Sequence, residues 1–330
     1  MNNSKTMVMK KNKFSISEVN GINGLEIIIK NDSTNESFSI LPDSGARLCE
    51  LFLHNGVELI SVIKKIKNVD SESRDDIFTN AKLSPFAGRI KAGEFTFKAV
   101  NYYLVKNYPE ENNACHGFVF DKKFVVTDKK VNEDSASCTL EYHYTGDVSG
   151  YPFPFLIELA YKLSASDGLT CTTKINNLSD VPIPLSDGWH FYFELGMKVD
   201  DLKLKIETNE MMELDPQMIP TGKRIMFTEF RTPQIIDNRH FDSCFKVTGN
   251  KKVVTQLLSA QRKIDLRIWQ ETGTGKYEYL VIYTPPDRKS IAIEPISSNI
   301  NTFNNGEGLI TLAAQETFIA CFGISLNKIV

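Results

Sequence analysis

Short runs of alternating apolar and polar residues dominate the chain. In 290–295 (SIAIEP), Ile291 and Ile293 are β-branched and alternate with small or polar neighbours, which is typical of a strand whose two faces meet different surroundings. Segments 25–30 and 37–42 have the same character and are separated by the polar cluster 31–36, so we expect an antiparallel pair. The other expected strands are 45–53, 57–60, 95–97, 102–104, 123–126, 137–144, 155–163, 169–176, 203–207, 252–259, 266–270, 280–284 and 318–325.

The segments between these strands are turns rather than helices or linkers. Asn55-Gly56 is a typical hairpin turn, and the most polar stretch, 64–76, predicts a surface excursion. No long segment has a helical period, and no Pro/Gly/Ser-rich linker or fixed repeat divides the chain. The pattern predicts an all-β fold, a large antiparallel β-sandwich, with residues 1–330 forming one domain.

Composition narrows the classes of protein that fit. The 330 residues are 42% hydrophobic and carry a formal net charge of -3, so we expect no nucleic-acid partner and no membrane partner. The six cysteines are scattered without a CxxC pair, which indicates buried thiols in a reducing compartment. Residues 1–11 lack the apolar core of a signal peptide, and no run is long enough to span a membrane. We expect a cytoplasmic protein.

Glu294 is the first candidate for chemistry. It stands at the end of the apolar run, directly before Pro295. Because proline cannot donate to a central ladder, Pro295 is expected to end or bend the strand. Glu294 would then lie at the end of a buried strand, and the rigid sheet could hold its side chain against a ligand. The alternative is a solvated glutamate at a sheet edge.

The five histidines differ in their surroundings. His54, in a turn, and His143, in an alternating strand, are expected to be structural or exposed, and His240 fits either role. His116 is followed by a glycine, which allows close approach to a ligand. His190 lies in the aromatic cluster 188–193 (GWHFYF), which suits a sugar pocket and equally a sandwich core.

Three other kinds of site find little support. The histidines lack metal-ligand spacing. Segment 273–276 (GTGK) lacks the full phosphate-loop pattern, and a hairpin turn explains it better. No Gly-x-Ser-x-Gly elbow of a serine hydrolase is present.

Four segments, taken in order, resemble motifs of the aldose 1-epimerase (galactose mutarotase) family. They are 84–90 (SPFAGRI) with 93–95, 113–117 (NACHG), 188–193 (GWHFYF), and 293–295 (IEP) with 301–304. A weaker fifth match is 241–245 (FDSCF). The chain departs from the pattern at Gly88, where many relatives have asparagine, and at Phe191, where they often have proline. Both departures concern which sugar hydroxyls are bound.

The resemblance implies the fold and activity of a mutarotase. The fold would be a galactose mutarotase-like supersandwich with a sugar cleft, and neither metal nor cofactor would take part. The activity would interconvert the α and β anomers of a free hexose by ring opening and reclosure. Glu294 would be the base at the C1 hydroxyl and His190 the acid at the ring oxygen. We also expect a pyranose to fit between these two side chains.

The resemblance also implies residues that bind the sugar. Arg89 and His116 would hydrogen-bond the ring oxygen and hydroxyls, Asp242 would accept from other hydroxyls, and Tyr192 would line the site.

Three alternatives stay open from the residues. The first is a carbohydrate-binding sandwich without turnover. The second is a glycoside hydrolase in which Asp242 or Asp187 partners Glu294. The third is a hexose-6-phosphate mutarotase, for which Arg89 and Lys91 would have to converge on the phosphate.

Overall fold

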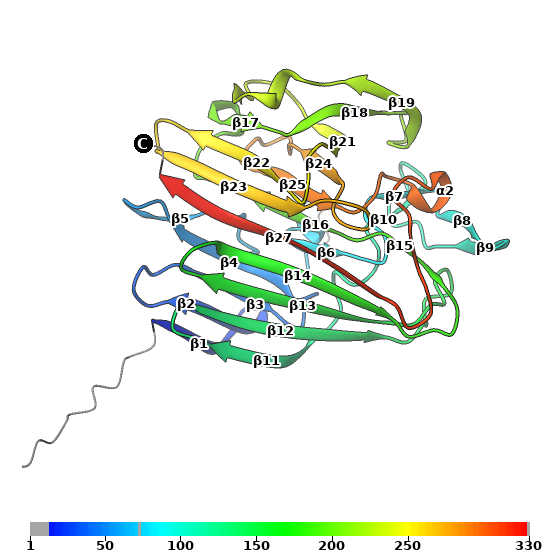
Figure 1. Cartoon of the computed structure of the whole chain (residues 1–330), viewed down its shortest axis with the longest axis horizontal. Coiled ribbons are helices and arrows are strands. Elements are labelled where there is room, and N and C mark those ends of the chain that lie inside the picture. The colour runs from blue at the N-terminus through cyan, green and yellow to red at the C-terminus, as the bar shows by residue number, and fades with distance from the viewer. Residues whose placement is uncertain (1–12, 72–73, 329–330) are drawn as a thin grey trace, which may run out of the picture.

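The computed structural model describes residues 13–71 and 74–328, which form an almost entirely antiparallel β structure (Figure 1). The N-terminal stretch 1–11 and residues 72–73 of the expected excursion lie outside the described residues. In the described part of the chain, no helix is long and apolar enough to cross a membrane.

The largest sheet has nine strands and forms one layer of the fold, with the C-terminal strand β27 near its middle (Figure 1). Its strands alternate between buried and less buried positions, as in β14, because every second side chain faces the core. In spatial order they are β11 (Val125–Val131), β12 (Ser135–Tyr144), β13 (Phe155–Ser164), β14 (Gly168–Asn177), β27 (Thr317–Lys328), β23 (Ile264–Glu271), β22 (Lys252–Ser259), β17 (Lys203–Lys205) and β20 (Gln234–Ile235).

Two further sheets cover the inner face of this layer. The five-stranded sheet contains β1 (Phe14–Gly21), β2 (Gly24–Asn31), β3 (Ser37–Leu41), β4 (Arg47–His54) and β5 (Leu59–Ser61). The seven-stranded sheet contains, in spatial order, β19 (Pro220–Met226), β18 (Thr208–Leu214), β21 (Asp242–Val247), β24 (Tyr279–Tyr283), β25 (Ile291–Ile296), β16 (Gly188–Phe193) and β6 (Ala81–Leu83).

Short ladders and single-turn helices complete the fold. The two-stranded ladders join β7 (Arg89–Lys91) to β10 (Asn113–Cys115), β8 (Glu94–Phe97) to β9 (Val100–Tyr103), and β15 (Ile183–Leu185) to β26 (Ile310–Leu312). The helices are single turns: α1 (Arg74–Ile77), α2 (Thr302–Asn305), η1 (Val199–Asp201) and η2 (Glu229–Arg231).

Aromatic side chains fill the space between the layers. Trp189 of β16 packs against Tyr161 of β13 and Phe322 of β27, with ring centroids 5.9 and 5.4 Å apart. Such pairs bury large apolar areas and hold the sheets in register. One core cluster extends from Phe14 to Leu326, and this continuity supports the proposal that residues 1–330 form one domain.

The sequence predictions of fold and strands are largely confirmed. The chain is an antiparallel all-β sandwich, Asn55-Gly56 lies in the β4–β5 hairpin, and no long helix occurs in residues 13–71 and 74–328. Segments 155–163 and 169–176 agree with β13 and β14 to within a residue. The pattern missed β1, β18, β19 and six strands of two or three residues. It also missed β16 and β21, whose positions are buried or half-buried without strict alternation. Segment 273–276 does not form a hairpin turn, since it connects β23 and β24 of different sheets.

Candidate active site

The centre of the candidate site is a contact between His190 and Glu294. Strands β16 and β25 are neighbours, and their register places His190 opposite Glu294. His190 Nε2 lies 3.3 Å from Glu294 Oε1, and both side chains are buried. Residues opposed on neighbouring antiparallel strands have Cβ atoms only about 5 Å apart. The expectation that a pyranose lies between the two side chains is therefore wrong, and a sugar has to lie over both.

Pro295 lies inside β25 rather than at its end. It pairs with Leu280 of β24, and the strand continues to Ile296 between two neighbouring strands. The ladder to β16 is interrupted at Glu294 and Pro295, where proline has no N–H to donate. Pro295 is predicted to end or bend the strand, and the strand ends one residue later, at Ile296. The alternative of a solvated glutamate is wrong, because Glu294 is 2% exposed.

Arg89 and His116 reach the same pocket from the β7–β10 ladder, in which Arg89 pairs with Cys115. The His116 N–H donates to the Gly88 carbonyl over 3.0 Å, and the Gly88 N–H donates to His116 Nδ1 over 3.3 Å. Because Nδ1 accepts a hydrogen bond, the proton of the neutral imidazole is on Nε2. His116 thus presents an N–H donor at its Nε2 atom.

Gly117, which follows His116, is required by backbone packing. Its φ of 69° lies in the left-handed region, and an added Cβ would stand 2.0 Å from the Ser84 carbonyl oxygen. Gly117 and Ser84 form a β-bridge that ties the two motif segments together. The close neighbour that requires a glycine at position 117 is therefore the backbone of Ser84. That Gly117 also allows a ligand to approach stays a prediction.

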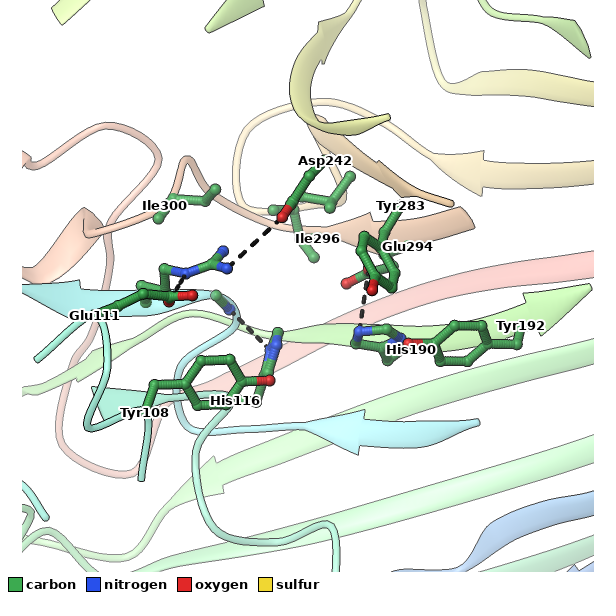
Figure 2. Close-up of a pocket in the computed structure, with 13 residues that line it drawn as sticks. Tyr108, Glu111, His116, His190, Tyr192, Asp242, Tyr283, Glu294, Ile296 and Ile300 are labelled. Atoms are coloured by element: carbon green, nitrogen blue, oxygen red, sulfur yellow. Dashed lines mark hydrogen bonds and ion pairs between the residues drawn. The ribbon is translucent and has the colours of Figure 1, made fainter. Parts of the chain in front are cut away.

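Asp242 and Tyr192 complete the predicted set. Asp242 begins β21, and its Oδ2 lies 3.9 Å from Arg89 Nη2. Tyr192 shares the face of β16 with His190, and the two rings stack with centroids 4.9 Å apart. The six predicted residues line one pocket: Arg89, His116, His190, Tyr192, Asp242 and Glu294. All of them except Arg89 are labelled in Figure 2. The cavity volume is about 130 Å³, roughly tenfold the space that one water needs.

Sequence reasoning missed three polar residues of the pocket, namely Tyr108, Glu111 and Tyr283. Tyr283 lies on β24, which the sequence did predict, but nothing in the local pattern shows that β24 neighbours β25. Tyr108 and Glu111 lie in a connecting loop with no strand signal. The other missed residues of the lining are Gly88, Val281, Ile296 and Ile300.

Burial shifts the pKa values of the central pair toward neutral groups. Desolvation raises the pKa of Glu294 well above its usual range, with Asp242 adding to the rise and Arg89 opposing it. Desolvation lowers the pKa of His190 to about 3. A carboxylic acid therefore faces a neutral imidazole. This pair holds one proton that can pass between the partners without changing their total charge.

Other candidate residues lie outside the pocket lining. His143 is exposed, and His54 Nδ1 accepts the Gly56 N–H within its turn. His240 Nδ1 lies 3.2 Å from Thr284 Oγ1. Asp187 is fully buried and ion-paired with Lys82. Across residues 13–71 and 74–328, no group of three or more His, Cys, Asp or Glu side chains is placed to hold a metal ion.

The sheets and the pocket define a galactose mutarotase-like all-β protein. A family model described as aldose 1-epimerase matches residues 27–322. The chain belongs to the aldose 1-epimerase family, whose members are isomerases that act on small sugars.

The chain is also similar to curated proteins and to solved structures. Uncharacterized protein YihR of Escherichia coli (strain K12) is 24% identical over 251 residues, 73% of this chain and 77% of the relative. The aldose 1-epimerase of Streptococcus thermophilus is 26% identical over 207 residues, 58% of each chain. A galactose mutarotase-like protein from Clostridium acetobutylicum has a similar fold, with a TM-score of 0.83, 24% identity, and coverage of 96% of this chain and 99% of that chain.

Proposed function

We propose that the protein interconverts the α and β anomers of a free hexose. The observation that carries this proposal is the buried contact between His190 and Glu294, 3.3 Å apart in a pocket lined by hydrogen-bonding side chains. Opening a hemiacetal requires removal of the proton from the C1 hydroxyl and protonation of the ring oxygen. An acid and a base in contact supply both groups at one place.

In the proposed reaction, Glu294 takes the C1 hydroxyl proton and His190 protonates the ring oxygen. The C1–O5 bond then breaks, and C1 becomes a carbonyl carbon. After rotation about C1–C2, O5 attacks the other carbonyl face, and the two protons return. The reactive form of the pair is a Glu294 carboxylate beside a His190 imidazolium. It carries the same single proton as the neutral pair, but on His190 instead of Glu294.

The surrounding groups orient the sugar over this pair. We propose that Arg89 and His116 donate to the ring oxygen and hydroxyls and that Asp242 accepts from a hydroxyl. Tyr192 offers an aromatic face beside His190. A carbohydrate-binding sandwich would need the aromatic face but not a buried acid–base pair. The cytoplasmic location belongs to the same proposal, and the six free thiols support it.

The geometry argues against Asp187 as a hydrolase partner and against a phosphate site. Asp187 is no partner for Glu294 in glycoside hydrolysis, because it is held in a fully buried ion pair with Lys82. Asp242 does share the pocket with Glu294. A phosphate site would need Arg89 and Lys91 to converge, but Lys91 is exposed and is not part of the pocket lining.

Polarimetry on freshly dissolved α-galactose and α-glucose tests the proposal directly. We expect the protein to accelerate the approach to the anomeric equilibrium above the spontaneous rate, in proportion to enzyme concentration. Heat-denatured protein is the control. Failure to accelerate any free aldose, with the protein shown to be folded by circular dichroism, would contradict the proposal.

The pH dependence of kcat/KM tests the central pair. The pair keeps one proton from the lowered pKa of His190, about 3, up to the raised pKa of Glu294. Activity should therefore stay level from about pH 6 to about pH 4, whereas a glutamate of ordinary pKa would lose its base form over this range. The measurement is the polarimetric rate after subtraction of the buffer rate, with His143→Asn as a control variant. A fall centred near pH 4.5, with the fold intact, would contradict the raised pKa.

A further inference from the structure

Glu111 is held in a closed loop beside the pocket. The Tyr108 N–H donates to the Asn113 carbonyl and the Asn113 N–H donates to the Tyr108 carbonyl, over 3.1 and 3.0 Å. The Asn113 side chain fixes the base of this loop further, since its amide donates to the Gln217 carbonyl and its oxygen accepts the Ala92 N–H. The loop therefore presents the Glu111 carboxylate from a rigid base.

The partner of Glu111 is Arg89. Glu111 Oε2 accepts from Arg89 Nε over 2.8 Å, and both side chains are largely buried, at 19% and 12% exposure (Figure 2). Tyr108, from the same loop, lies with its ring centroid 5.8 Å from the guanidinium carbon. Asp242 stands on the other side of the guanidinium, 3.9 Å from Nη2. Arg89 is thus placed between two carboxylates.

The side chains that line the pocket carry a net negative charge, although one of them is an arginine. Arg89 is the one Lys or Arg among the described residues of the lining. Its charge is opposed by Glu111 and Asp242, while the His190–Glu294 pair contributes no net charge. Lys64 approaches the Tyr192 ring to 5.4 Å, but it is ion-paired with Asp76.

We propose that Glu111 is a specificity-determining residue that selects against anionic sugars. By accepting from Nε, it holds the Arg89 guanidinium in place and offsets the charge that would attract a phosphate or carboxylate. The site then takes neutral aldoses and tolerates a cationic amino sugar. This inference rests on the proposed mutarotase function. An anionic group of a sugar about 5–8 Å from the Glu111 carboxylate is repelled by it. In a partly buried site this repulsion lowers kcat/KM for the anionic sugar on the order of tenfold to a hundredfold.

Matched neutral and anionic sugars test the inference. The full chain is assayed with galactose and galacturonate, which differ in charge at C6, and the ratio of their kcat/KM values is compared between variants. We expect wild type to favour galactose by at least about tenfold, and Glu111→Gln to reduce that ratio by about tenfold. Glu111→Asp keeps the charge and should keep the preference. Glu110→Gln removes the same charge from the neighbouring exposed position and should leave the ratio unchanged.

The outcomes separate this inference from the proposed function. If wild type accelerates mutarotation of neither these two sugars nor any other free aldose, the mutarotase proposal fails. If galactose is turned over but Glu111→Gln leaves the ratio unchanged, or Glu110→Gln alters it equally, only the inference is overturned. Should Glu111→Gln lose all activity, a salt titration of wild type decides. Screening must then raise kcat/KM for galacturonate relative to galactose, and a ratio insensitive to salt overturns the inference.

Discussion

Glu294→Gln is expected to lower kcat/KM for mutarotation by about 10²–10⁴-fold, the range that one positioned acid–base group supplies. Glutamine has the same shape and still offers an oxygen to His190, but it cannot take a proton from the C1 hydroxyl. Sugar binding should be largely spared because Arg89, His116 and Asp242 stay in place. Polarimetry gives the rate, and near-wild-type activity in the variant would refute the assignment.

The same substitution should raise the stability of the protein above neutral pH. The folded-state pKa of Glu294 is raised well above its usual value. Between the unfolded and folded pKa values the folded state therefore binds more protons, so the free energy of unfolding falls as pH rises. Glutamine removes this dependence. We expect a higher Tm than wild type at pH 8 and a smaller difference at pH 5.

Glu307→Gln is the contrasting control for this stability effect. Burial opposes ionisation of Glu307, but hydrogen bonds from Arg224 and Asn299 outweigh it and lower the pKa below its usual range. Ionised Glu307 therefore contributes stability above its unfolded pKa, and glutamine should lower the Tm at pH 8. Opposite signs of the change in Tm would distinguish the buried Glu294 carboxyl, which lies beside a neutral imidazole, from Glu307, which is ion-paired with Arg224. A lower Tm in both variants would contradict the raised pKa of Glu294.

The sequence anticipates the site where the signal is local. Ordered motifs identified Arg89, His116, His190 and Glu294, and the structure places all four in one pocket. The direct contact between His190 and Glu294 was not anticipated. It follows from the register of β16 on β25, and strand pairing is a non-local property that a one-dimensional pattern does not contain.

Residues whose role depends on a partner far away in the sequence are even harder to predict. Glu111 stands in a polar loop, and its ion pair joins positions 22 apart. Lys82 of β6 is 0% exposed, and no sequence prediction singled it out. Because charged residues are mostly exposed, the residue type predicts an exposed lysine at position 82, whereas the folded chain buries it. Its burial depends on partners that only the folded chain brings together.

Lys82 belongs to a buried polar network behind His190. Its Nζ forms an ion pair with Asp187, donates to the Gly188 carbonyl over 3.0 Å and lies 4.4 Å from the Trp189 ring centroid. Tyr277 donates its hydroxyl to Asp187 over 2.9 Å. Burial lowers the pKa of Lys82 to about 8, although Asp187 opposes that shift. The network thus fixes residues 187–189, immediately before His190, from the core side of β16.

Lys82→Met is expected to lower the free energy of unfolding by about 3–5 kcal/mol, because it leaves Asp187 buried without its cation. Lys82→Met with Asp187→Asn should recover part of this loss, since no uncompensated charge then stays in the core. Lys65→Met is the matched control. Its ion pair with Glu50 is exposed at the lysine, so the change should stay within about 1 kcal/mol. Urea unfolding measures all three variants. A loss below about 1 kcal/mol for Lys82→Met, or no recovery in the double variant, would show that the buried pair does not act as a unit.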